Sequence, residues 1–221
     1  MPTSTVENYL KAIWALQGSL ADGDLVPVGQ VAERLEVAPG TATTMMNQLA
    51  KKALVDYVSR RGVRLSEKGR KAAMDVLRRH RLVETFLVEV MKFDWAEVHE
   101  DAEILEHAIS DRLLQRMDEM LSHPTHDPHG APIPGPDGEL VRDGSTVLAD
   151  CAPGDYILSR VREDRPSFLQ WLADHDLKPG RALTLGERNA AAGTISLHLP
   201  GREDALQISF LAARSLLVSN A

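Results

Sequence analysis

The sequence has few of the features that mark secreted and membrane proteins. Cys151 is the only cysteine among 221 residues, so no disulfide can form within the chain, and this suits a reducing compartment. No apolar stretch approaches the roughly 18 residues that a membrane helix needs. No basic start followed by an apolar run and a small-residue cleavage site indicates a secretory signal. We therefore expect a cytoplasmic protein with no membrane partner.

Charge is distributed unevenly along the chain. Residues 1–80 carry a net charge of +4, from 12 Lys and Arg against 8 Asp and Glu. Residues 81–221 carry −11, from 13 against 24. The length allows one large or two ordinary domains. A basic N-terminal part followed by an acidic remainder indicates an anion-binding module joined to a second module with a different role.

The basic part has the pattern of a winged helix-turn-helix. A short helix is predicted over 28–35, and after a break at 36–38 Pro39 suits the first position of a second helix. The segment LVDYVSRRGVRLS then predicts two short strands around residues 60–62. Two helices joined by about three residues and followed by a basic hairpin define this motif. The alternative is an amphipathic helix in a generic bundle, which the hairpin disfavours.

The outer side of the second helix carries small polar side chains that can enter a major groove. Candidates for reading base edges or binding phosphates are Thr41, Thr43, Thr44, Asn47 and Gln48. Candidates for phosphate contacts on either side are Lys51, Arg60 and Arg61.

Helices and then strands are predicted after the hairpin. Long periodic segments predict helices from Ser66, from about Trp95 to Ser110, and over 111–121. Residues 123–144 contain five of the twelve prolines and predict an irregular linker. The segments TVLADC, YILSRV, ALTL, TISLHL and ALQI predict five strands, interrupted by one helix around SFLQWLAD. Five short strands in about 75 residues favour a small, partly open β-barrel.

The expected fold is therefore mainly α-helical with a β-rich C-terminal domain. The boundaries expected for the winged helix, the helical domain, the Pro-rich linker and the barrel are 1–72, 73–122, 123–144 and 145–221.

The segment HEDAEILEH (99–107) contains two histidines and four acids. In one helix, four of these side chains lie within an arc of about 100°: His99, Glu103, Glu106 and His107. On the preceding predicted helix, His80 and Glu84 share a face because they are four residues apart. A solvated charged face is the alternative for any one pair, but the convergence of six favours a metal. Imidazole and carboxylate without thiolate suit Mn²⁺, Fe²⁺, Co²⁺, Ni²⁺ or Zn²⁺.

Three further histidines, His123, His126 and His129, lie in the Pro-rich segment. Their loose spacing and proline neighbours favour a polar loop over a metal site.

The blocks VENYLKAIWAL, VAERLEVAPGTATTMMNQLAKKALV, RRHRLVETFL, VHEDAEILEHAIS and PHGAPIP closely resemble the diphtheria toxin repressor family of metal-dependent bacterial transcription regulators, which has a manganese-responsive branch. The resemblance covers about residues 4–135. The C-terminal 75 residues resemble the SH3-like β-barrel domain of many members. The family implies a homodimer that binds palindromic operator DNA, with the middle helices forming the metal sites and the dimer interface.

The resemblance also implies two metal sites. One takes His80, Glu84 and His99, and the functionally dominant one takes Glu103, Glu106 and His107. Glu103 stands where iron-responsive members have a cysteine, and a hard oxygen there shifts the preference toward Mn²⁺, with Fe²⁺ as the alternative.

Two positions on the first helix depart from the family pattern. Asn8 replaces a Met or Asp ligand and offers only a neutral amide oxygen. Lys11 replaces an acid of the manganese branch and cannot be a ligand. In the C-terminal domain, Glu163 or Asp164 could supply an oxygen ligand.

We therefore expect a metal-dependent repressor that is not an enzyme and takes no small organic substrate. One alternative is a helical carboxylate–histidine metalloenzyme, which would need an open coordination position and a substrate pocket. The other is a DNA-binding protein with a purely structural metal, which would unfold when the metal is removed.

Overall fold

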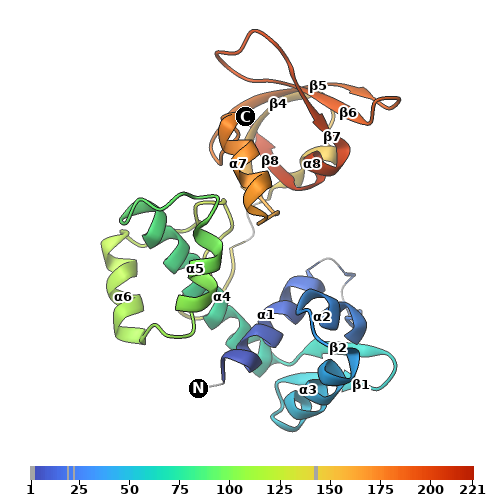
Figure 1. Cartoon of the computed structure of the whole chain (residues 1–221), viewed down its shortest axis with the longest axis vertical. Helices are drawn as coiled ribbons and strands as arrows, with labels where there is room; N and C mark the ends of the chain where they lie inside the picture. The colour runs from blue at the N-terminus through green and yellow to red at the C-terminus, as the bar shows by residue number, and fades with distance from the viewer. Residues whose placement is uncertain (1–2, 19, 22, 142–143) are drawn as a thin grey trace. The chain divides into compact units, whose positions relative to one another are not determined.

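The structure, a computed structural model, describes residues 3–18, 20–21, 23–141 and 144–221 (Figure 1). The chain divides into two compact units, Met1–His80 with Pro134–Glu139, and Arg81–Ile133 with Leu140–Ala221. The four domains expected from the sequence are a finer division, which these units do not test. Residues 142–143 of the expected linker lie outside the described residues.

The first unit is built from three helices, a hairpin and the start of a fourth helix. They are α1 (Ser4–Gln17), α2 (Val28–Arg34), α3 (Pro39–Lys51), β1 (Val55–Val58), β2 (Gly62–Leu65) and α4 (Glu67–Glu89). The two strands are antiparallel, with Val55 opposite Leu65 and Val58 opposite Gly62. This confirms the predicted winged helix-turn-helix.

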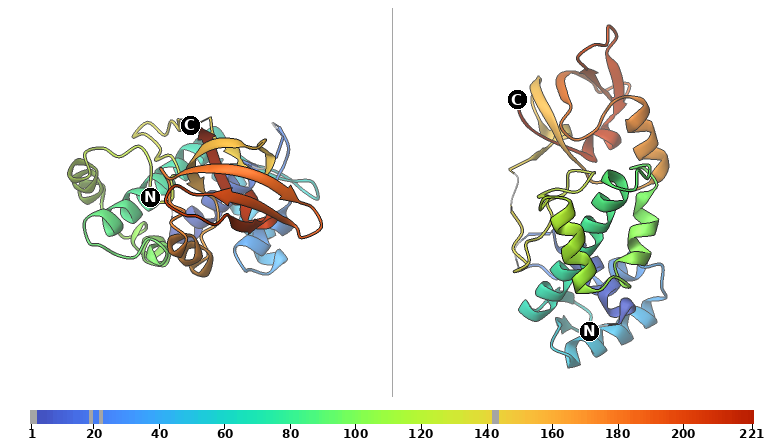
Figure 2. Two further views of the ribbon diagram at one scale, coloured as in Figure 1. Left: turned by 90° about the horizontal axis from the view of Figure 1, so that it is seen from above. Right: turned by 90° about the vertical axis from the view of Figure 1, so that its left-hand side faces the viewer.

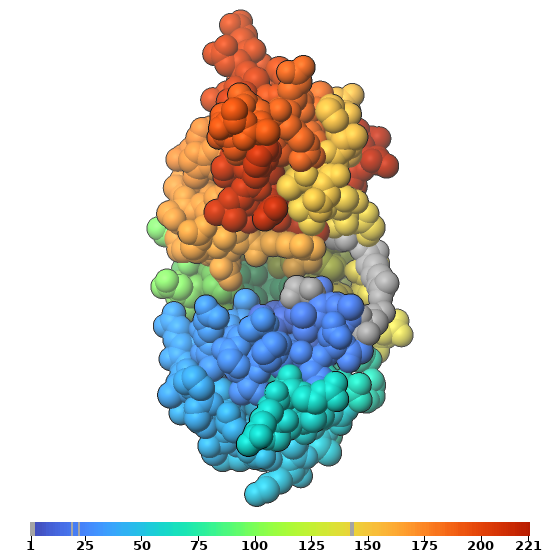
Figure 3. Space-filling model, turned by 90° about the vertical axis from the view of Figure 1, so that its right-hand side faces the viewer, coloured from blue at the N-terminus to red at the C-terminus, as the bar shows by residue number. Residues whose placement is uncertain are grey.

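Helix α3 begins where the sequence predicts. Ala38 is extended and Pro39 occupies the first turn, where its missing N–H leaves no hydrogen bond unmade. One side of α3 packs Ala42, Met46 and Leu49 into the core of the unit. The other side stays exposed in this unit, whose surface is blue to cyan in Figure 3.

The second unit contains the rest of α4, with α5 (Val98–Leu105) and α6 (Asp111–Met120). The prediction of one helix from Trp95 to Ser110 is wrong at both ends. Trp95 and Ala96 belong to the hydrophobic core of the C-terminal sheet, so the chain before Val98 follows that packing. After Leu105 the chain makes a turn, in which Ala108 and Ile109 both donate to the Leu105 carbonyl.

A six-stranded antiparallel sheet forms the rest of this unit, in the order β3-β8-β4-β5-β6-β7. Its strands are β3 (Thr146–Val147), β4 (Gly154–Val161), β5 (Ala182–Asn189), β6 (Thr194–His198), β7 (Leu206–Ser209) and β8 (Leu216–Asn220). Helix α7 (Pro166–Asp174) packs Leu169 and Leu172 into the core of the sheet, and Figure 2 shows the strands from two further directions. The predicted class, helical with a β C-terminal domain, is confirmed.

Two details of the sheet differ from the prediction. Strand β8 was not predicted, because the short helix α8 (Phe210–Arg214) separates it from β7 without a glycine or proline to mark a turn. The predicted strand TVLADC is a strand only at Thr146–Val147 and continues as a 3-10 turn over Leu148–Asp150. Among the described helices, none has both the length and the apolar character needed to cross a membrane.

Gly69, in the first turn of α4, has no room for a side chain. A Cβ atom there would lie 1.8 Å from the carbonyl oxygen of Leu54, the residue that precedes β1. The N–H of Gly69 also donates to Ser66 Oγ at 3.0 Å. The backbone of the first turn of α4 therefore lies in direct contact with the backbone just before the hairpin.

We predict that Gly69→Ala lowers the free energy of unfolding by about 2 kcal/mol, because the helix or the hairpin must move. Gly29→Ala is the matched control, since Gly29 is also helical but a Cβ there meets nothing within 4 Å. It should be neutral or stabilising by up to about 1 kcal/mol. Urea unfolding of the full chain measures both, and equal effects would contradict the prediction.

Candidate metal centre

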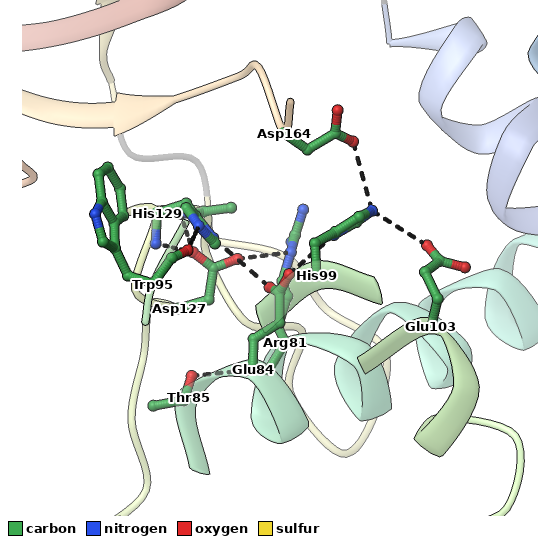
Figure 4. Close-up of polar contacts among 10 residues, drawn as sticks. Arg81, Glu84, Thr85, Trp95, His99, Glu103, Asp127, His129 and Asp164 are labelled. Atoms are coloured by element: carbon green, nitrogen blue, oxygen red, sulfur yellow. Dashed lines mark hydrogen bonds and ion pairs between the residues drawn. The ribbon is translucent and has the colours of Figure 1, made fainter. Parts of the chain in front are cut away.

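His99, the second residue of α5, is surrounded by three carboxylates in the second unit (Figure 4). Its Nδ1 lies 3.0 Å from Glu84 Oε1, on α4. Its Nε2 lies 3.5 Å from Glu103 Oε1, one turn further along α5, and 3.5 Å from Asp164 Oδ2, in the segment between β4 and α7. Two helices and the segment that follows β4 therefore contribute to one cluster.

The contact with Glu84 decides which nitrogen of His99 can bind a cation. A carboxylate only accepts, so in neutral His99 the proton is on Nδ1 and the lone pair is on Nε2. That lone pair faces the oxygens of Glu103 and Asp164. Metal-bound histidines commonly donate their other N–H to a carboxylate in this way. One imidazole nitrogen and two carboxylates, without thiolate, fit a divalent transition metal.

Asp164 and Glu163 lie in different surroundings, although they are neighbours in the sequence. Glu163 Oε1 is 2.8 Å from Arg165 Nε, so its carboxylate faces that guanidinium. Asp164 faces His99. Of the two oxygen donors considered from the sequence, the structure brings Asp164 to the cluster.

The other predicted ligands are placed as follows. His80 is buried on α4, one turn before Glu84, and is the last residue of the first unit. Glu106 is fully buried directly after α5, and its Oε1 lies 3.4 Å from His107 Nε2. Asn8 is half-buried on α1, in the first unit. Metal binding by each of these residues stays a prediction.

A second, more deeply buried group lies behind Glu84, and the sequence analysis did not predict it. His129 Nδ1 is 3.9 Å from Glu84 Oε2, and Arg81 Nε is 3.5 Å from Asp127 Oδ2. The Arg81 guanidinium also donates to the Pro132 carbonyl. The segment around Asp127 and His129 was expected to be a polar loop. Its Asp-Pro-His-Gly sequence is typical of a tight turn, which was the one available signal that its side chains are fixed.

Burial and charge shift the pKa values of this group. Burial, and then the charge of Glu84, raises the pKa of the Asp127 carboxyl. Burial lowers the pKa of His129, but its contact with Glu84 and the charges of Glu84 and Asp127 outweigh this, so the net shift is upward. Burial lowers the pKa of Arg81 to about 10, against the opposing effect of Asp127. Arg81 therefore stays charged at neutral pH.

The candidate DNA-binding side chains lie on the exposed face of the first unit. Three of them are hydrogen-bonded to the helix itself, since Thr43 Oγ1 and Thr44 Oγ1 donate to carbonyls four residues earlier at 2.9 Å and Asn47 Nδ2 does so at 3.0 Å. The others are also exposed: Thr41, Gln48, Lys51, Arg60 and Arg61. A hollow between the helices and the hairpin is lined by Thr43, Tyr57 and residues 27–29 and 59–62.

Comparisons with known proteins agree with this fold. Residues 1–63 match the family model described as "Iron dependent repressor, N-terminal DNA binding domain", and residues 66–135 match "Iron dependent repressor, metal binding and dimerisation domain". The diphtheria toxin repressor of Corynebacterium glutamicum (strain ATCC 13032) is 33% identical over 81% of this chain and 78% of its own length. The iron-dependent repressor IdeR of Mycobacterium leprae (strain TN) is 29% identical over 90% of both chains.

A solved structure described as a manganese-dependent transcriptional repressor in complex with manganese is 36% identical, with a TM-score of 0.89, covering 98% of this chain and 100% of the other. By its fold and its family matches, the chain is thus a metal-dependent transcriptional repressor. It belongs to the diphtheria toxin repressor family.

We predict that Asp127→Ala lowers the free energy of unfolding by about 3 kcal/mol, because it removes the carboxylate that faces the buried Arg81 guanidinium. Asp56→Ala is the matched control. It removes the carboxylate of an ion pair with Arg64 of similar length, 3.0 Å, but with side chains 49% and 56% exposed. That change should cost less than about 1 kcal/mol. Thermal or urea unfolding without added metal compares them, and equal costs would disprove the prediction.

Proposed function

We propose that this protein senses Mn²⁺ or Fe²⁺ and, as a metal-bound homodimer, represses genes of metal homeostasis by binding palindromic operator DNA in the cytoplasm. The observation that carries the proposal is the position of His99 Nε2, 3.5 Å from both Glu103 Oε1 and Asp164 Oδ2, in a chain that also contains a winged helix.

The metal would be held by His99 Nε2 with the carboxylates of Glu103 and Asp164. His80, one turn before Glu84 on α4, is a further candidate donor for this centre. We propose that Glu84 orients His99, since Glu84 faces Nδ1 rather than Nε2. Bound metal would supply positive charge that neutralises the converging carboxylates and so stabilises this arrangement of helices and sheet.

A second centre is proposed at Glu106 and His107, with Asn8 as a candidate amide donor. Glu106 is fully buried, and its Oε1 lies 3.4 Å from His107 Nε2. A buried carboxylate next to an imidazole is a donor pair that transition metals accept. The assignment of Asn8 rests on the sequence alone.

Mn²⁺ is the proposed physiological ion. Glu103 contributes a hard oxygen where a cysteine would favour softer ions. Relatives described as iron-dependent and as manganese-dependent are both similar to this chain. Fe²⁺ is therefore the alternative to be tested.

The first unit is the proposed DNA-binding module. Its exposed Lys51, Arg60 and Arg61 would contact phosphates on either side of α3, and α3 would lie in the major groove. Because a dimer has two-fold symmetry, its operator would be palindromic.

Dimerisation is supported by exposed apolar side chains on the helices of the second unit. Ile104, Leu113 and Met120 are 71%, 51% and 53% exposed. Exposed apolar side chains on consecutive helices are candidates for contact with another protein chain. The family model matched at residues 66–135 carries dimerisation in its description.

Metal and operator binding would be thermodynamically coupled. If metal tightens DNA binding by a given factor, DNA tightens metal binding by the same factor. The metal is then a co-repressor, and this distinguishes the protein from one whose metal only maintains the fold.

We predict that the apo protein stays folded and binds its own promoter region at least about tenfold more weakly than the Mn²⁺ form, a coupling in the usual range of 1–3 kcal/mol. Anaerobic titrations with Mn²⁺, Fe²⁺ and Zn²⁺, followed by fluorescence anisotropy of the DNA, measure the coupling. Circular dichroism of the same samples reports folding.

The double variant Glu106→Ala, His107→Ala should keep the fold and lose the response. Equal DNA affinity in chelator and in Mn²⁺ would refute the proposed function. Unfolding of the apo protein would instead indicate a structural metal.

We predict that Asp164→Asn lowers the affinity for Mn²⁺ about tenfold or more, because a neutral amide replaces a carboxylate that faces His99 Nε2. Glu163→Gln is the adjacent control and should bind Mn²⁺ like the wild type, since Glu163 faces Arg165. Electron paramagnetic resonance of free Mn²⁺ gives both affinities. The assignment of Asp164 fails if the two variants bind equally.

A further inference from the structure

We propose that residues 132–139, the Pro-rich strap, brace α4 where this helix passes from the first unit to the second, and that this brace determines how strongly metal binding is coupled to operator binding. The inference rests on the proposed function and extends it. It assigns the coupling to a segment that contains none of the proposed metal donors or DNA-binding residues.

The strap is a second covalent connection between the two units, besides α4 itself. Helix α4 is continuous from Glu67 to Glu89, and the boundary between the units falls after His80. The chain reaches the first unit again through residues 134–139, whereas Ile133 and Leu140 belong to the second unit. The part of the strap within the first unit is thus joined to the second unit at both of its ends.

Two arginines of α4 bind the strap, one before and one after the boundary. Within the first unit, Arg78 Nη1 donates to the Pro134 carbonyl at 2.7 Å. Within the second unit, Arg81 Nη1 donates to the Pro132 carbonyl. Hydrogen bonds from a charged donor are roughly twice as strong as those between neutral groups. A bend of α4 between these two arginines would strain or break at least one of the bonds.

The contacts of the strap follow one face of α4. Gly138 is buried, and a Cβ atom there would lie 3.4 Å from Met74 Cβ. Met74, Arg78 and Arg81 lie within an arc of about 60° around the helix and span about two turns. Their partners occur in the reverse order along the chain, so the strap runs antiparallel to α4.

The composition of the strap makes it stiff. Prolines at positions 132, 134 and 136 fix their own φ angles, and each holds the residue before it in an extended conformation. The strap then ends in a closed turn, in which Gly135 N donates to the Glu139 carbonyl at 2.8 Å. A stiff segment held at two points resists bending of the helix, whereas a flexible one would follow it.

The start of the strap is anchored within the second unit. Ile133 N donates to the Thr125 carbonyl at 2.8 Å. Gly130, two residues before the strap, has a φ of +81°, and a Cβ atom there would lie 1.9 Å from the carbonyl oxygen of Ser159 on β4. The strap therefore cannot slide along α4 without a movement of the chain against the sheet.

The competing interpretation is that the strap only covers apolar surface, since residues 132–134 are buried. In that case, loss of the bond from Arg78 would lower the stability and leave the coupling unchanged. Arg78→Met tests this, because it keeps an unbranched apolar side chain and removes the guanidinium. Lys71→Met is the matched control. It removes the same charge from an exposed position of α4 that, among the described residues, makes no hydrogen bond with the strap.

The readout is the ratio of the affinities for the protein's own promoter region in Mn²⁺ and in chelator, by fluorescence anisotropy with the full chain. We expect Arg78→Met to lower this ratio at least about threefold, as do other substitutions that modulate coupling. Mn²⁺ affinity without DNA, by electron paramagnetic resonance, should stay within about threefold of the wild type. Lys71→Met should leave the ratio unchanged, because a lost attraction to phosphates affects both forms equally. An unchanged ratio in Arg78→Met would overturn the proposal.

Hydrogen exchange of the metal-free proteins reports on α4 directly. The backbone amides of residues 79–84 should exchange faster in Arg78→Met than in the wild type, and at the wild-type rate in Lys71→Met. Equal exchange in all three proteins would contradict the brace.

A reversible cross-link keeps the proposal testable if Arg78→Met lowers stability. Met74→Cys and Gly138→Cys are added to Arg78→Met, because Cβ atoms at these two positions lie 3.4 Å apart, close to the separation across a disulfide. Cys151, the remaining cysteine, is buried. The oxidised protein should recover the coupling ratio and the reduced protein should not. Both have the same sequence, so any strain at residue 138 is shared. Equal ratios would overturn the proposal.

A wild type that binds DNA equally in Mn²⁺ and in chelator would overturn the proposed function and this inference together. A coupled wild type with an equally coupled Arg78→Met would overturn the inference alone.

Discussion

The contact between Glu84 and His99 is the constraint on which the polar cluster of the second unit depends. It joins a buried carboxylate of α4 to an imidazole of α5 at 3.0 Å and leaves Nε2 of His99 free of the proton. Glu103 and Asp164 then face a lone pair rather than an N–H group. Without Glu84, the ring of His99 could turn or change tautomer, and the three remaining side chains would form only a set of partly exposed polar contacts.

The spacing of apolar residues predicted helices and strands well where one face of the helix or strand is buried and the other is exposed. Helix α3 could be predicted from Pro39 and from the spacing of its apolar side chains. Of the four expected to face inward, Ala42, Met46 and Leu49 are buried and Met45 is half-buried against the same core. Strand β8 could not be predicted, because its apolar residues continue from α8 without a turn signal. The ends of α5 were misplaced because Trp95 packs into a core formed by residues far along the chain. The periodic spacing of apolar residues within one segment cannot predict a contact with residues far along the chain.

The same distinction applies to the candidate site. His99 and Glu103 could be paired from their spacing of four residues along α5. Asp164 could be named only together with Glu163, because two adjacent acids in a loop have no periodicity to separate them. His129 was assigned to a polar loop, since nothing in the sequence shows that it stacks on Trp95 and faces Glu84. Contacts between elements distant in the chain are decided by packing, and the site is built mainly from such contacts.

The packing of Trp95 and Gly130 has a consequence for the modularity of the chain. Trp95, which precedes α5, lies in the core of the sheet, and Gly130, in the Pro-rich segment, fits against Ser159 of β4 without space for a methyl group. The sheet is therefore not an independent domain that could be exchanged for the equivalent domain of a relative. A chimaera joined within the Pro-rich segment would place a foreign strand against both residues. Successful recombination would require the junction to lie before Trp95 or the contacts of both residues to be transplanted with the sheet.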